Sequence, residues 1–162
     1  MKRSISFKWT NFECLVSSSI QRIKAVIPDN VKLNIEVPGN LQVCVDPEQI
    51  EQVMINLILN AVQAMEDGGE IEVTAYPQED KGAFCFQIRD TGCGILEENI
   101  GKIFDPFFTT KEVGKGTGLG LSIVYGNIEQ HGGKISVTSE QEKGTTISVF
   151  LPIMEDVDKV QR

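Results

Sequence analysis

Three glycines alternate in the second half of this 162-residue chain, at Gly116, Gly118 and Gly120, and an apolar helical run begins at Leu121. Glycine can adopt positive φ and lie close to a ligand, and a helix start presents free N–H groups and a positive dipole end. The stretch therefore suits a polyphosphate. It matches neither the dinucleotide fingerprint G-x-G-x-x-G nor the P-loop.

Two asparagines four residues apart are the next candidates for chemistry. A helix from Asp46 to about Met65 is predicted, because Asp46 can cap it and Pro47 suits its first position. Asn56 and Asn60 share one face of that helix, beside its apolar stripe. They are either solvated or capping amides, or a row of oxygens aimed into a pocket next to the core.

The third candidate is a carboxylate, Asp90, at the end of a predicted strand over 83–88. Gly92 and Gly94 follow it, spaced by one residue. An acceptor at a strand end beside glycines suits a flat ligand that approaches the backbone. The same residues also suit an ordinary Asp-initiated turn.

The helices and strands that position these candidates can be predicted from the spacing of the apolar residues. Residues 1–10 are interpreted as a boundary or leading segment, 11–152 as one domain and 153–162 as a frayed charged tail. Helices are predicted at 11–27, 46–65, 96–104 and 118–130, and strands at 31–37, 41–45, 70–76, 83–88, 134–139 and 145–151. Strands that come as hairpins favour a two-layer α/β sandwich with a mixed, mostly antiparallel sheet and helices on one face.

Two stretches carry further expectations. Leu96, Ile100, Ile103 and Phe104 are predicted to be buried in the 96–104 helix. The aperiodic stretch at 105–117 is long enough to be a functional lid, anchored by Phe107 and Phe108.

Composition narrows the function classes. A net charge of −8 argues against nucleic acid as a main partner. No apolar run approaches the length of a membrane span, so no membrane contact by this chain is expected. The cysteines are scattered, at Cys14, Cys44, Cys85 and Cys93, which favours reduced thiols in a cytoplasmic protein.

Together these blocks resemble the boxes of a known family. Asn56-x-x-x-Asn60, Asp90-x-Gly92-x-Gly94, 104–108 (FDPFF) and Gly116-x-Gly118-x-Gly120 look like the N, G1, F and G2 boxes of the catalytic, ATP-binding domain of two-component sensor histidine kinases. The resemblance extends to a further glycine box at 144–146 and implies the GHKL ATPase fold.

The resemblance implies ATP and Mg²⁺ as ligands. Asn60 would supply an oxygen to Mg²⁺, with Asn56 near the phosphates, and Asp90 would accept from the adenine amine. Lys111 or Lys115 would offset γ-phosphate charge, and Asn56, Asn60 and Lys111 would be the catalytic residues. The nucleotide-binding residues implied are Asn56, Asn60, Gln63, Asp90, Gly92, Gly94, Ile95, Lys111, Lys115, Gly116, Thr117, Gly118, Leu119, Gly120, Leu121 and Thr145.

Two features set the expected reaction. Related ATPases such as type II topoisomerases carry a glutamate where this chain has Asn56, and an amide cannot act as a general base at neutral pH. The histidine-bearing dimerisation domain of the kinases is missing, and the only histidine, His131, fits a helix C-terminus. The resemblance implies phosphoryl transfer to that separate domain, with a response regulator receiver domain downstream. The alternatives are a nucleotide-binding interaction module without transfer activity and a GHKL-type ATPase.

Overall fold

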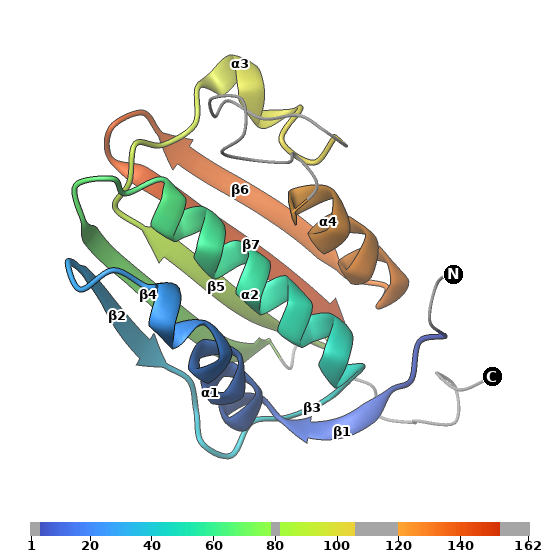
Figure 1. The fold of residues 1–162 in the computed structure, drawn as a ribbon. Helices are drawn as coiled ribbons and strands as arrows, with labels where there is room; N and C mark the ends of the chain where they lie inside the picture. The colour runs from blue at the N-terminus through green and yellow to red at the C-terminus, as the bar shows by residue number, and fades with distance from the viewer. Residues whose placement is uncertain (1–3, 79–81, 106–119, 153–162) are drawn as a thin grey trace.

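The structure, a computed structural model, describes residues 4–78, 82–105 and 120–152. Its helices lie across one face of a five-stranded sheet, as Figure 1 shows. This is the two-layer sandwich predicted from the order of helices and strands. Of the helices that the structure describes, none combines the length and the apolar character needed to cross a lipid bilayer.

The main sheet has the strand order β2-β4-β5-β7-β6. Its first pair, β2 and β4, is parallel, and the other three pairs are antiparallel, so the sheet is mixed and mostly antiparallel as predicted. The strand bounds are β2 Val31–Glu36, β4 Gly69–Gln78, β5 Ala83–Asp90, β6 Lys134–Glu140 and β7 Gly144–Pro152.

A separate two-stranded sheet joins β1 (Lys8–Asn11) to β3 (Gln42–Val45). The predicted strands on either side of the 38–40 turn therefore do not form a hairpin with each other. The reason is that β2 pairs in parallel with β4, whereas β3 pairs with β1. The next residue, Phe12, extends this link by donating its N–H to the carbonyl of Leu41 at 2.9 Å.

Three helices build the second layer: α1 (Phe12–Ile23), α2 (Pro47–Gln63) and α4 (Gly120–Gln130). A short 3₁₀ turn, η1 (Lys24–Val26), follows α1. The core lies between these helices and the sheet, where the ring of Phe12 packs against Phe84 and Phe86 with centroids 5.5 and 5.2 Å apart. The long helix α2 begins as predicted, because the Asp46 carboxylate accepts from the N–H groups of Glu48 and Gln49.

The predicted helix over 96–104 is wrong in length. Only α3 (Glu97–Ile100) is helical, and Leu96, expected in the core, is 41% exposed because it precedes the helix in an extended conformation. Ile103 is buried as predicted, whereas Ile100 and Phe104 are only partly buried. Phe104 packs on Tyr125 of α4 with ring centroids 5.7 Å apart.

Candidate functional site

The paired asparagines of α2 face the first residue of α4. Asn56 Nδ2 donates to the Gly120 carbonyl at 3.5 Å, and Asn60 Nδ2 lies 3.8 Å from where a Cβ on Gly120 would stand. Both asparagines are half-buried. These contacts show that the amides face the start of α4 beside the core and are not fully solvated.

Asn60 also carries an orphan polar atom. Its buried amide nitrogen has no hydrogen-bond partner among the described residues. A buried polar group without a partner is costly, and such groups are rare in folded proteins. An amide can turn either its oxygen or its nitrogen toward the same place, so this side chain is suited to a ligand at the start of α4.

A hard cation fits this donor. Mg²⁺ takes oxygen ligands and needs few from the protein, the rest being supplied by water and phosphate. The Asn60 oxygen would therefore suffice as the protein ligand of a magnesium–nucleotide complex. It stands beside Gly120, where a helix start favours negative charge.

Asp90 ends β5 as a buried carboxylate, 7% exposed. Its Oδ1 accepts from the N–H of Gly92 at 2.8 Å. Burial raises the pKa of the Asp90 carboxyl above its ordinary value, and hydrogen bonds from the backbone N–H groups of Gly92 and Thr145 partly oppose this. The result is a desolvated acceptor whose ionised form is held by backbone donors.

The two glycines after Asp90 are required by the turn itself. A Cβ on Gly92 would lie 2.6 Å from the carbonyl oxygen of Ala64, at the end of α2, and Gly94 has a φ of +76°. A Cβ on Gly94 would also meet the Glu140 carbonyl. The Cβ sides of both glycines are thus filled by protein, so the ligand role predicted for them would use the opposite side of the turn.

A pair of hydroxyls connects this turn to the sheet. Ser139 Oγ accepts from the N–H of Ile95 at 2.7 Å and lies 2.8 Å from Thr145 Oγ1. Thr145 is buried beside Asp90 in the register of β5 and β7. Sequence reasoning missed Ser139, although its alternation in β6 places it on the inner face opposite Thr145.

Helix α2 connects the two halves of the site. Its residues Asn56 and Asn60 contact the start of α4, and one turn later Ala64 accepts from the N–H of Cys93 at 3.0 Å. One turn of α-helix rises about 5.4 Å. The amide pair and the Asp90 turn therefore lie close together at the C-terminal end of α2.

The remaining predicted residues divide into two groups. Gln63 lies at the end of α2 with an exposed side chain, and Leu121 is partly buried against the core. The other predicted ligands and the phenylalanine pair lie outside the described residues: Lys111, Lys115, Gly116, Thr117, Gly118, Leu119, Phe107 and Phe108.

His131 is buried at the other end of α4, 3% exposed. Its Nε2 accepts from the Asp46 N–H at 3.0 Å, and its Nδ1 donates to the Asn127 carbonyl at 2.8 Å. The ring of Phe7 packs edge-on against it. These contacts define a neutral imidazole that joins the end of α4 to the start of α2.

Comparison with known proteins shows which family this stretch of the chain matches. Residues 45–155, more than half of the chain, match the family described as histidine kinase-, DNA gyrase B- and HSP90-like ATPases. The matched region begins just before α2 and includes the asparagine pair, the Asp90 turn and the start of α4.

Curated relatives are sensor kinases of bacteria. The chain is 49% identical over 120 residues to sensor kinase CckA of Brucella abortus, covering 66% of the chain and 13% of that protein. It is 44% identical over 108 residues to sensor histidine kinase ZraS of Escherichia coli K12, covering 67% of the chain and 22% of that protein. The chain thus spans less than a quarter of the length of either relative.

Solved structures agree with these matches. The nucleotide-free catalytic domain of histidine kinase ThkA superimposes with a TM-score of 0.81 at 34% identity, covering 91% of this chain and 96% of that one. ThkA in complex with the response regulator TrrA gives 0.79 at 31% identity, covering 94% and 43%. Full-length ShkA in complex with AMPPNP gives 0.81 at 25% identity, covering 94% and 32%.

Proposed function

We propose that this chain, which belongs to the family of histidine kinase-, DNA gyrase B- and HSP90-like ATPases, binds Mg-ATP and transfers its γ-phosphoryl group to a histidine on a separate domain. Its relatives CckA and ZraS are named as sensor kinases. The corresponding acceptor would be the dimerisation domain of the parent kinase, and a response regulator would receive the phosphoryl group next, as the ThkA–TrrA complex suggests.

The observation that carries the proposal is the convergence on α2 of a half-buried asparagine pair, the start of a helix and a buried carboxylate. Asp90 would accept from the adenine amine, and the N–H groups at the start of α4 would hold phosphate. Asn60 would hold Mg²⁺, which when bound would neutralise charge on the transferred phosphoryl group. Lys111 or Lys115 would add positive charge there.

Asn56 favours transfer over hydrolysis. Its amide donates to the Gly120 carbonyl, and an amide cannot take a proton from water at neutral pH. The chain would therefore hold the nucleotide and leave the choice of nucleophile to a docked partner. The chain then needs only to position the nucleotide and neutralise its charge, and these are the main requirements of phosphoryl transfer.

A labelled-phosphate experiment tests the proposal. The chain is incubated with γ-labelled Mg-ATP, with and without a histidine-bearing hairpin domain from a sensor kinase. Acid-labile label on that domain's histidine is expected, and Asn60→Ala should abolish it together with magnesium-dependent binding measured by calorimetry. Bound but unreacted ATP would support the interaction module instead, and rapid release of phosphate would support an ATPase.

A further inference from the structure

The helices α2 and α4, side by side in Figure 1, are joined by a row of amide side chains. Gln49 Nε2 donates to Gln130 Oε1 at 2.8 Å, and Asn127 Nδ2 donates to Gln52 Oε1 at 3.0 Å. Asn56 completes the row at the start of α4. We call this set, Gln49, Gln52 and Asn56 with Gln130, Asn127 and Gly120, the amide ladder.

The ladder follows the antiparallel register of the two helices. Its pairs advance three residues along α2 while they go back three residues along α4, from Gln49–Gln130 to Gln52–Asn127. Beneath it the contact is apolar, with Val53, Val124 and Ile128 buried. Apolar side chains pack without strong direction, whereas hydrogen bonds require defined distances and angles.

Asn127 is the central member. Its Nδ2 also lies 3.3 Å from the carbonyl oxygen of Gln49, and its own carbonyl accepts from His131. One side chain thus ties α4 to both a side chain and the backbone of α2. Since Gly120 lies seven residues earlier on the same rigid helix, a shift at Asn127 is carried to the end where phosphate would bind.

We propose that Asn127 and Gln52 are positioning residues: they fix the start of α4 relative to Asn60, and so set how well phosphate is held. This inference rests on the proposed function, because it assigns these residues to the phosphate end of that nucleotide site. Asp90 lies at the C-terminal end of α2, away from the Gln49–Gln130 and Gln52–Asn127 pairs, which join the N-terminal half of α2 to α4. Breaking the ladder therefore weakens phosphate binding and leaves adenine recognition intact.

The test compares the affinity of Mg-ATP with that of adenosine by calorimetry, well below the unfolding temperature. Asn127→Leu removes the two hydrogen bonds that Asn127 Nδ2 donates to α2, at nearly constant side-chain volume. The ratio of ATP to adenosine affinity is expected to fall about fivefold, the equivalent of one neutral hydrogen bond, with the adenosine affinity unchanged. The matched control is Asn34→Leu, the same chemical change on the edge strand β2, which leaves the ratio unaltered.

A rescue pair separates positioning from simple stabilisation. Asn127→Asp alone removes the donor without changing the shape, and combining it with Gln52→Lys restores a bridge of reversed polarity. The double variant should recover at least part of the lost ratio. A ladder that only stabilises the fold would lower the unfolding midpoint in Asn127→Leu and leave the affinity ratio at the wild-type value, and that result would overturn the proposal.

Hydrogen exchange keeps the two proposals distinguishable. If the wild-type chain bound neither ATP nor adenosine, the proposed function would fail, but the ladder could still be judged in the free protein. Faster exchange at Val124 and Tyr125, the first amides of α4 with helical partners, is expected in Asn127→Leu and not in Asn34→Leu. Unchanged exchange there would reject the ladder as the element that fixes the start of α4.

Discussion

Two buried titratable groups, Asp90 and His131, mark opposite ends of the helical layer, and burial moves their pKa values in opposite directions. The carboxyl of Asp90 has its pKa raised, because its charged form loses water. The imidazole of His131 has its pKa lowered for the same reason, since its charged form is the protonated one. Both are held by backbone hydrogen bonds, so their protonation is tied to the geometry of the fold.

Adenine recognition should depend on pH through Asp90. Because its pKa is raised, the carboxylate protonates at a higher pH than an exposed aspartate does, and an ionised acceptor is lost as the pH falls through that value. We expect the preference for ATP over GTP to decline about tenfold as the pH falls through the raised pKa of Asp90, because a hydrogen bond to a charged group contributes about that much to affinity. Calorimetry at a series of pH values measures it, and Asp90→Ala should show a low preference at every pH.

Fold stability should depend on pH through His131. Its folded pKa lies below the ordinary value of 6.5, so the unfolded chain binds more protons between the two values, and stability rises with pH there. The contribution is fully present above about pH 6.5 and is lost as the pH falls below it. Urea titrations of the wild type and His131→Gln should converge toward acid pH. If the free energies of unfolding of the two proteins instead changed in parallel with pH, the lowered pKa of His131 would be contradicted.

At the scale of elements, the Asp90 turn is a packed joint between α2, β5 and the β6–β7 hairpin. Ala64 accepts from Cys93, and the carbonyl of Cys93 in turn accepts from the N–H of Glu142 at 2.6 Å. Gly92 is needed because the backbone of α2 occupies the place of its Cβ. The candidate ligand-binding turn is therefore shaped by contacts with the protein before any ligand arrives.

Replacing Gly92 should accordingly destabilise the ligand-free protein. Gly92→Ala puts a methyl group 2.6 Å from the Ala64 carbonyl, and overpacking of this kind costs about 1–3 kcal/mol. Denaturant unfolding without nucleotide measures the loss. The control is Gly101→Ala, since no neighbouring group from the described residues lies within 4 Å of a Cβ at Gly101. Equal stability of both variants would mean that the glycine serves a ligand alone.

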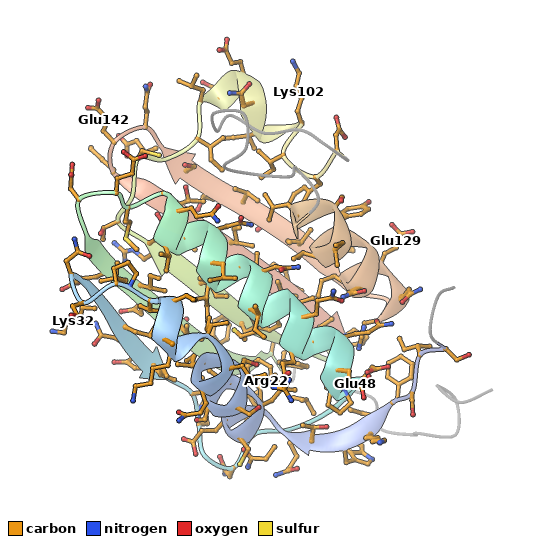
Figure 2. The ribbon with its side chains drawn as sticks, in the orientation of Figure 1. Arg22, Lys32, Glu48, Lys102, Glu129 and Glu142 are labelled. Atoms are coloured by element: carbon orange, nitrogen blue, oxygen red, sulfur yellow. The ribbon has the colours of Figure 1, made fainter. Side chains whose placement is uncertain are left out.

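At the scale of the whole molecule, the candidate nucleotide-site residues lie at one end of α4, and the only histidine of the chain lies at the other end. Figure 2 shows the charged side chains of Glu129, on α4, and Lys102, just after α3, on the outside of the molecule, whereas His131 is buried. The 11 residues of α4 span about 16 Å. The described part of the chain thus presents no accessible histidine near the site.

We therefore expect negligible phosphorylation of His131. Its two ring nitrogens are already engaged, with Asp46 and Asn127, and neither faces the start of α4. Incubation of the isolated chain with labelled Mg-ATP, followed by peptide mapping at alkaline pH, should find no acid-labile phosphate on the peptide that contains His131. Label on that peptide would place an acceptor within this chain and would contradict transfer to a separate domain.

Patterns local in the sequence determined much of this protein. The start of α2 followed from Asp46 and Pro47, and the β4–β5 and β6–β7 hairpins followed from alternation, because caps and alternation act between residues close in the chain. The order of Asn56, Asn60, Asp90 and Gly120 also predicted the family. These features do not depend on which residues pack against them across the core.

Only the tertiary structure decided the rest, because those features depend on residues distant in the sequence. The partner of β3 is β1 and not β2, Leu96 is exposed, and Gly92 is required by Ala64 of α2. His131 was assigned to a helix end from the sequence. Its bond to Asp46, 85 residues away, and the amide ladder beside it exist only because two antiparallel helices pack in one particular register, which no local pattern specifies.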